Sequence, residues 1–183
     1  MDNSSVSRLL SGARRGDPGS IEGLLAAIYP EVLRYMRYRV GRGAAGDLAG
    51  EVVVRVAKSV ARQKGAFTGW LYAIARNVVA DHYRRNARRR EEPLEDKPGA
   101  PGSSGESPAS EVNRRMDIEQ AMRRLTEDQR ELIVLKFVQG LSNGEIGEIT
   151  GRKQEAIRGL QFRALSALRE NLGSEESSDE RAS

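Results

Sequence analysis

Apolar residues recur at intervals of three and four along much of the chain, the spacing that places them on one face of an α-helix. The first run covers 21–36, where Pro30 predicts a kink or a new helix start. A second run covers 47–60 and a third covers 70–85, with Thr68 as a candidate cap for the third. No segment shows sustained strand alternation bounded by hairpin turns. The pattern therefore predicts an all-α fold.

The C-terminal part continues this pattern with clearer boundaries. Apolar residues keep helical spacing over 112–125, and the four residues 126–129 form a capping-box pattern ahead of another apolar run. Two further short helices are separated near Gly151, which supplies a turn position, and Gly147 lies where the second helix must pass closely. This arrangement predicts a helix-turn-helix whose second helix is able to enter a major groove.

A segment of different composition separates the two helical parts. Four of the six prolines lie between Pro93 and Pro108, among glycines, serines and acidic residues. Such a segment cannot bury enough apolar surface to offset its ordering entropy. The predicted organisation is a helical domain over 1–90, a flexible acidic linker over 91–110, a helix-turn-helix domain over 111–172 and a disordered acidic tail over 173–183.

The composition excludes several classes of chemistry. The 183 residues include no cysteine and one histidine, which leaves no disulfide, no thiolate metal site and no plausible catalytic triad. We therefore expect no enzyme activity, no metal site and no cofactor. No apolar stretch is long enough to span a membrane, and no signal peptide is evident. We expect a soluble, cytoplasmic protein that has no membrane partner.

Charge is distributed unevenly along the chain. The formal net charge is +4, but residues 1–90 hold 17 lysines and arginines against seven aspartates and glutamates. The linker and the tail are acidic, and 111–172 is nearly neutral. The N-terminal part is therefore the candidate for binding a polyanion.

Six arginines between Arg76 and Arg90 strengthen that expectation, because arginine forks match phosphate oxygens. Asn77 could read the edge of an unpaired base. Nearby aromatic residues could stack on bases: Phe67, Trp70, Tyr72 and Tyr83. The alternative is that the arginines form a solvated helix end and that Trp70 belongs to the core, which its spacing favours.

The second helix of the helix-turn-helix carries donors suited to duplex DNA. Arg158 and Gln161 can bond base edges, while Arg152 and Lys153 can hold phosphates. These charges could also be the solvated face of an ordinary helical hairpin. Because the surrounding charge is nearly balanced, this part would add sequence preference to affinity supplied elsewhere.

Both parts together resemble one family. The string WLYAIARN at 70–77, followed later by a helix-turn-helix, resembles the bacterial RNA polymerase sigma factors of the small extracytoplasmic-function (ECF) group, in the sigma-70 family. The resemblance covers about 10–90 and 111–172. Residues 47–56 look like the family's polymerase-binding helix, 67–85 like its minus-ten segment, and 125–169 like its minus-thirty-five segment.

The resemblance implies a function in promoter-specific transcription initiation. It implies binding to core RNA polymerase, through the clamp helices of the largest subunit and through the flap, association with the nucleoid in holoenzyme, and control by an anti-sigma factor. The residues implied to bind polymerase are Asp47, Leu48, Glu51 and Val52. Those implied at minus-ten DNA are Arg76, Asn77, Asp81, Arg84 and Arg85. Those implied at minus-thirty-five DNA are Arg152, Lys153, Gln154, Glu155, Arg158, Gln161 and Arg163.

The sequence departs from the family in places, and other functions stay open. Gly50 stands where the family usually has glutamine, and Gly159 with Leu160 replaces a frequent serine–arginine pair. The connection 59–65, which in the family shapes the pocket for a flipped base, is short. One alternative is a stand-alone helix-turn-helix regulator that binds duplex without polymerase. Another is an adaptor that binds polymerase but not DNA.

Overall fold

The computed structural model describes residues 3–91 and 118–179, and every regular element within those ranges is helical. The predicted all-α fold class is therefore confirmed for the described residues. Contacts divide the chain into two units, with the division falling between the described ranges, and each unit is described by itself. The predicted linker, apart from Glu91, lies outside the described residues.

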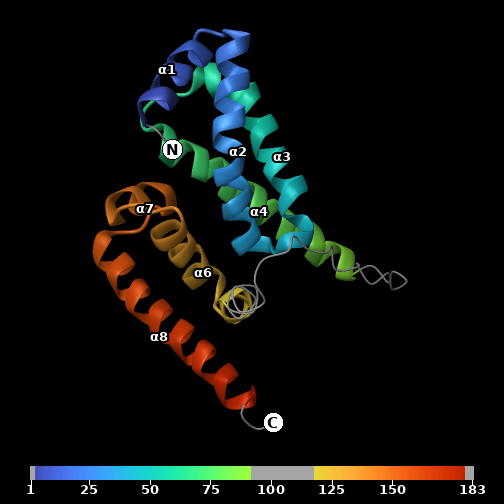
Figure 1. Ribbon diagram of the computed structural model, residues 1–183, viewed down its shortest axis with the longest axis vertical. Helices are drawn as coiled ribbons and strands as arrows, with labels where there is room; N and C mark the ends of the chain where they lie inside the picture. The colour runs from blue at the N-terminus through green and yellow to red at the C-terminus, as the bar shows by residue number, and fades with distance from the viewer. Residues whose placement is uncertain (1–2, 92–117, 180–183) are drawn as a thin grey trace. The chain divides into compact units, whose positions relative to one another are not determined.

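The first unit is built around two long antiparallel helices, α2 and α3, which lie side by side, with α1 and α4 packed against them (Figure 1). A short 3-10 turn, η1, follows α3. The elements are α1 (Asn3–Arg14), α2 (Pro18–Val40), α3 (Arg42–Ser59), η1 (Val60–Arg62) and α4 (Phe67–Glu91).

The core of this unit follows the predicted spacing of apolar residues. In α2, Leu24, Ile28 and Val32 are completely buried. Val56 of α3 and Val78 of α4 are completely buried as well. Because each helix contributes one apolar stripe, the opposite sides of α3 and α4 are left for charged residues.

Helix α2 continues through Pro30 without interruption, so the predicted restart does not occur. Pro30 is exposed, on the side of the helix where a carbonyl that loses its amide partner can turn toward water. Asp17 caps the helix start, since its carboxylate accepts a hydrogen bond from the Ser20 amide at 2.8 Å.

Two details of the helix ends differ from the sequence prediction. Helix α1 was not predicted, although its apolar residues, Val6, Leu9, Leu10 and Ala13, have helical spacing and Ala13 is fully buried. Helix α4 begins at Phe67, so Thr68 lies inside the first turn and is not its cap. The Trp70 amide instead donates to the Ala66 carbonyl at 3.2 Å.

The second unit consists of a helical segment over 118–123 followed by a compact group of helices (Figure 1). Its central helix ends in a π-helical turn, η2. The elements are α6 (Glu127–Ile133), η2 (Val134–Val138), α7 (Asn143–Thr150) and α8 (Gln154–Asp179). Helices α6 and α8 pack against each other, and Val134 and Leu135 of η2 and Ile157 of α8 are completely buried.

Two capping boxes fix the starts of α6 and α7. The predicted box at Thr126 and Gln129 is confirmed, with reciprocal hydrogen bonds of 3.3 Å and 3.0 Å. Ser142 and Glu145 form a second box, in which the Ser142 amide donates to Glu145 Oε2 at 2.8 Å. These bonds satisfy amides that the first turn of a helix leaves without partners.

Helix α8 extends to Asp179, whereas the composition predicts a disordered tail from Gly173. Over 173–179 the structure has a helix in place of that tail. No proline follows Gly173, so nothing in the sequence breaks the backbone pattern of the preceding helix. Within the described ranges, no helix is long and apolar enough to cross a membrane.

Candidate nucleic-acid interface

Five charged residues join α3 to α4 in the first unit. Arg55 Nη2 donates to Glu51 Oε1 at 2.5 Å and to Asp81 Oδ2 at 2.9 Å. The other Asp81 oxygen accepts from Arg84, and Arg85 donates to Glu51 Oε2 at 3.3 Å. We call this set, Glu51, Arg55, Asp81, Arg84 and Arg85, the α3–α4 ion-pair cluster. It connects the predicted polymerase-binding helix with the predicted minus-ten helix.

The hydrogen bonds of the cluster favour the ionised form of Asp81. The hydrogen bond from Arg55, followed by that from Arg84, lowers the pKa of Asp81 below its ordinary value of 3.8. The hydrogen bond to Asp81 in turn raises the pKa of Arg55. The cluster contains three arginines and two carboxylates, and so has one more basic than acidic side chain.

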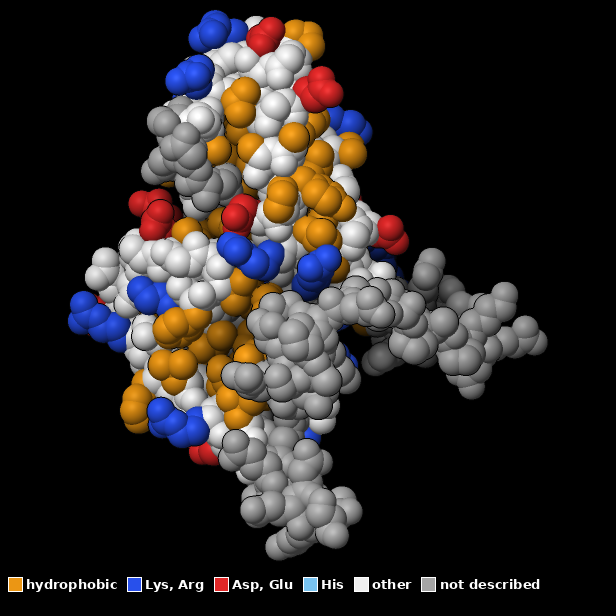
Figure 2. Space-filling model, viewed as in Figure 1, with side chains coloured by type: hydrophobic (Ala, Val, Ile, Leu, Met, Phe, Trp, Pro, Cys, Tyr) orange, Lys and Arg blue, Asp and Glu red, His pale blue; other side chains and the backbone are white. Residues whose placement is uncertain are grey.

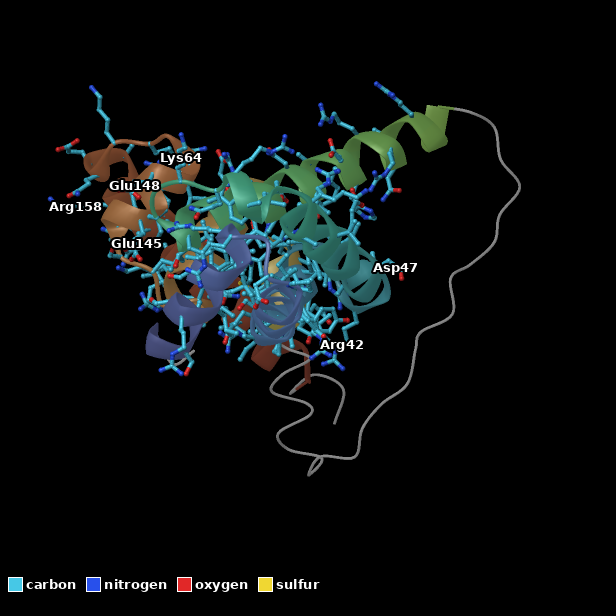
Figure 3. All side chains as sticks on the ribbon, turned by 90° about the horizontal axis from the view of Figure 1, so that it is seen from above. Arg42, Asp47, Lys64, Glu145, Glu148 and Arg158 are labelled. Atoms are coloured by element: carbon cyan, nitrogen blue, oxygen red, sulfur yellow. The ribbon has the colours of Figure 1, made fainter. Side chains whose placement is uncertain are left out.

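The four residues predicted to bind polymerase do not share one surface. Leu48 and Val52 are buried, with exposed fractions of 5% and 0%, and they hold α3 against the unit's core. Their contact with polymerase stays a prediction, and the surface of α3 that is open to a partner is carried by other residues. Asp47 is exposed on the outer side of α3 (Figure 3), and Glu51 is partly exposed within the cluster.

Val54 of α3 was missed by the sequence analysis. It is 50% exposed, unusually high for a valine, and it lies on the same side of the helix as Asp47 and Gly50. The signal was available, because positions 47, 50 and 54 are separated by three and four residues. We call Asp47, Gly50 and Val54 the outer face of α3.

The predicted minus-ten residues lie along α4 at the same kind of spacing. Asn77, Arg84 and Arg85 are exposed, Asp81 is partly buried within the cluster, and Arg76 is partly buried. The intervals from 77 through 81 to 84 and 85 place these side chains on one face. The structure thus brings Asn77, Arg84 and Arg85 together on α4. Asp81 lies beside them, and its carboxylate accepts a hydrogen bond from Arg84.

The aromatic residues of α4 are mostly occupied within the unit. Tyr72 is 3% exposed, and the Tyr83 hydroxyl donates to the Arg39 carbonyl at 2.8 Å. Phe67 and Trp70 pack against each other with ring centroids 5.8 Å apart, and both are partly buried. The Tyr83 ring is itself 38% exposed, so the rings of α4 that a base could reach are those of Phe67, Trp70 and Tyr83.

The connection between η1 and α4 is held by a buried glutamine that the sequence analysis missed. Gln63 is 5% exposed, and its Nε2 donates to the carbonyls of Lys64 and Gly65 at 2.8 Å and 3.1 Å. Its Oε1 accepts from Arg14 Nε of α1 at 3.0 Å. Because a buried amide needs partners on both sides, these bonds fix the path of the chain just before α4.

The second unit contains the predicted helix-turn-helix. Helix α7 ends at Gly151, which has a φ of 71°, a left-handed conformation that favours glycine. The position of Gly147 is equally restricted, since a Cβ there would lie 3.0 Å from the Arg152 carbonyl oxygen. The two glycines let α7 and α8 approach closely and set the direction in which α8 leaves the turn.

The predicted minus-thirty-five residues lie at the start of α8 and mostly face solvent. Arg158 projects away from the unit (Figure 3), and Gln161 is partly buried. The exposed members are Lys153, Gln154, Glu155, Arg158 and Arg163. Arg152 differs, because its Nη2 lies 2.6 Å from Asp128 Oδ2 and so ties the turn to α6.

Phe162 is the residue of α8 that the sequence analysis overlooked. Its side chain is 74% exposed, one turn after Arg158 and on the same side of the helix. Its spacing alone could have placed it there, because positions 158 and 162 are four residues apart.

Other hydrophobic side chains reach the surface of each unit (Figure 2). In the first unit, Ile21, Leu25, Tyr29 and Val53 line an open apolar depression of about 560 Å³ between α2 and α3. In the second unit, Phe137 and Leu165 are exposed by 53% and 36%. Among the described residues, no group of histidine and acidic side chains is arranged to hold a metal ion.

Comparison with known proteins identifies both units. The family model described as sigma-70 region 2 matches residues 24–89, and that described as sigma-70, region 4 matches residues 121–170. The ECF RNA polymerase sigma factor ShbA of Streptomyces griseus is 35% identical over 178 residues, covering 90% of this chain and 93% of that protein.

Two further relatives carry the same kind of name. The ECF RNA polymerase sigma factor SigD of Mycobacterium tuberculosis is 30% identical, covering 94% of this chain and 86% of its own. The ECF RNA polymerase sigma factor BldN of Streptomyces coelicolor is 33% identical, and the match covers 91% of this chain and 66% of that protein.

Solved structures share the fold at lower identity. CnrH in complex with the cytosolic domain of CnrY has a TM-score of 0.67 at 19% identity, covering 93% of this chain and 98% of the other. RpoE in complex with the anti-sigma factor NepR, from Bartonella quintana, has a TM-score of 0.66 at 21% identity, covering 83% and 96%. At these identities the likeness shows the fold alone.

Proposed function

Because the chain belongs to the ECF RNA polymerase sigma factors of the sigma-70 family, a family of transcription initiation factors, we propose that it binds core RNA polymerase and directs it to specific promoters. The region 2 unit would capture melted minus-ten DNA, and the region 4 unit would read the minus-thirty-five duplex. The observation that carries this proposal is the presence, in one chain, of an exposed arginine face on α4 and a helix-turn-helix.

For polymerase, we propose that the outer face of α3 docks on the clamp helices of the largest subunit. Asp47 supplies an exposed charge and Val54 an exposed apolar contact, a combination that suits an interface with a hydrophobic centre and a polar rim. The exposed Phe137 and Leu165 of region 4 would provide the apolar surface for the flap.

For minus-ten DNA, we propose that the α4 face grips melted strand. Arg84 and Arg85 would neutralise phosphates, and Asn77 would bond the edge of an unpaired base. Phe67 and Trp70 offer partly exposed rings for stacking. Extruding a base costs a few kcal/mol, which these contacts and polymerase together would offset.

For minus-thirty-five DNA, the N-terminal part of α8 would lie in the major groove. Arg158 and Gln161 carry donors for base edges, and Lys153 and Arg163 would contact phosphates. The apolar ring of Phe162 suits contact with a thymine methyl group. We assign Arg152 to the same surface, with its bond to Asp128 fixing the start of α8.

We also propose an anti-sigma factor as a partner. RpoE of Bartonella quintana, which shares the fold, was solved in complex with the anti-sigma factor NepR. In this chain, the apolar depression between α2 and α3 would give such a partner a hydrophobic contact surface. A cytoplasmic location and association with the nucleoid in holoenzyme follow from the proposed function.

The experiment that tests the proposal is transcription in vitro from genomic DNA with purified core polymerase, followed by mapping of start sites. Starts that share upstream elements, and that require this protein, are the expected result. If purified protein alone binds a palindromic duplex tightly, the stand-alone regulator is favoured. If polymerase binds but neutralising Arg84 and Arg85 leaves transcription unchanged, the adaptor is favoured.

The docking assignment has its own test. Asp47→Ala combined with Val54→Ala should weaken association with core polymerase, because both side chains are exposed and neither supports the core. Arg34→Gln on α2 serves as the matched control. Unchanged association in the double variant would contradict the assignment to α3.

A further inference from the structure

Asp81 is an unexpected residue for a surface that grips nucleic acid. A carboxylate repels phosphate, yet Asp81 lies in the middle of the α4 face between Asn77 and Arg84. Both of its oxygens are engaged, one by Arg55 and one by Arg84, and its side chain is only 27% exposed. Both carboxylate oxygens of Asp81 are therefore bonded to side chains of the protein itself.

We propose that Asp81 and Arg55 are positioning residues, which together hold α4 at a fixed orientation on α3 and direct Arg84 toward promoter DNA. This inference rests on the proposed function and deepens it, because it separates side chains that touch DNA from those that aim them. Arg84 is 70% exposed and Arg85 is 53% exposed, so both reach solvent while remaining anchored at the base of the face.

Arg55 is suited to this role by its shape and its place. Its planar guanidinium donates to two carboxylates on different helices, Glu51 of α3 and Asp81 of α4. A lysine would offer a single flexible point charge in the same position. The ion pair of Arg85 with Glu51 adds a second, longer link between the same two helices.

The charge balance gives Arg55 a second effect. With Arg55 present, three arginines face two carboxylates, and the excess positive charge is available to attract phosphate. Without it, Glu51 and Asp81 would each neutralise one of the α4 arginines, Arg84 and Arg85. Loss of Arg55 therefore both loosens α4 and removes the positive excess, although Arg55 itself does not touch DNA.

The cluster also connects the proposed polymerase-docking surface on α3 with the proposed DNA-binding face of α4. Glu51 lies one helical turn from Asp47 on the outer face of α3, and its carboxylate reaches Arg85 on α4. An orientation imposed on α3 by polymerase is thereby passed to the α4 face. Polymerase affinity itself should not depend on Asp81.

The test compares holoenzymes that contain Arg55→Gln, Asp81→Asn or both substitutions. We expect each single variant to reduce minus-ten opening, measured by permanganate reactivity of promoter thymines, by about three- to tenfold. Association with core polymerase should stay within about twofold of wild type. Promoter opening by the double variant should be no lower than that of the more impaired single variant, because the two residues act through one bridge. Arg55→Lys should restore part of the opening.

Arg34→Gln is the matched control, since it removes an exposed arginine from an ion pair with Glu31 inside α2. Additive losses in the double variant would overturn the inference, since they mean that Arg55 and Asp81 act separately. A parallel loss of polymerase affinity, or undiminished opening, would overturn it as well. Failure of the wild-type holoenzyme to initiate anywhere would instead refute the proposed function.

Discussion

Gly147 offers the sharpest test of the helix-turn-helix packing. A Cβ at this position would lie 3.0 Å from the backbone oxygen of Arg152 and 3.6 Å from Cδ1 of Ile157. The nearest atom belongs to the backbone of the turn, which cannot rotate away as a side chain could. Gly147→Ala must therefore displace α8 relative to α7 or strain the turn between them.

The size of the effect follows from two opposed contributions. Alanine gains about 1 kcal/mol over glycine inside a helix. Overpacking against a fixed neighbour costs about 1–3 kcal/mol. The net result for Gly147→Ala is a destabilisation of up to about 2 kcal/mol. Gly144→Ala, in the same helix, meets nothing closer than 3.8 Å and should be neutral or stabilising.

Hydrogen exchange of the α7 and α8 amides in the full chain measures this local stability without requiring two-state unfolding of both units. Faster exchange in Gly147→Ala, with exchange in α2 and α3 unchanged, is the expected outcome. Transcription from promoters that need the upstream element should fall in parallel. Protection in Gly147→Ala equal to that in Gly144→Ala would refute the packing argument.

Three further predictions concern single positions. Gly50→Gln places a side chain on the outer face of α3, where a Cβ meets nothing within 4 Å. The substitution should stabilise region 2 by up to about 1 kcal/mol and strengthen its association with polymerase in a pull-down titration. Phe162→Ala should leave the melting temperature nearly unchanged, because the ring is 74% exposed, but it should weaken holoenzyme binding to the minus-thirty-five duplex. Replacing thymine by uracil in that duplex should reduce the affinity of the wild-type holoenzyme more than that of the variant. The hydrogen bonds from Ser142 lower the pKa of Glu145 below 4.5, so the ionised carboxylate stabilises region 4 above that pH, and this stabilisation is lost as the pH falls. Glu145→Gln keeps the cap and should make the stability of region 4, followed by circular dichroism, less dependent on pH in the acid range.

Much of the fold could be predicted from the sequence because helices are local. The spacing of apolar residues identified α2, α3 and α4, and Gly151 marked the turn of the helix-turn-helix. Helix α1 was missed although Val6, Leu9, Leu10 and Ala13 recur at helical spacing, because that run is short. No new helix starts at Pro30, since a single exposed proline can be accommodated in a long helix that is packed on its other side.

The site was predicted less completely because its geometry depends on contacts between distant residues. Periodicity assigns Leu48 and Val52 to the same helix as Asp47, but it cannot tell which side faces the core until the neighbouring helices are placed. The bridge from Arg55 to Asp81 spans 26 positions, and the bond from Arg14 to Gln63 spans 49. Neither leaves a local signal in the sequence.

The distribution of charge explains why each unit should depend on the other and on polymerase. In region 4, Arg152 is neutralised by Asp128 and Glu155 faces the proposed groove, so nonspecific attraction to duplex is weak and sequence readout must dominate. Region 2 carries more of the positive charge, since residues 1–90 hold 17 lysines and arginines against seven aspartates and glutamates. Tethering the two units would raise the effective concentration of the second at DNA once the first is bound. Under the proposed function, promoter choice would then require both elements in register.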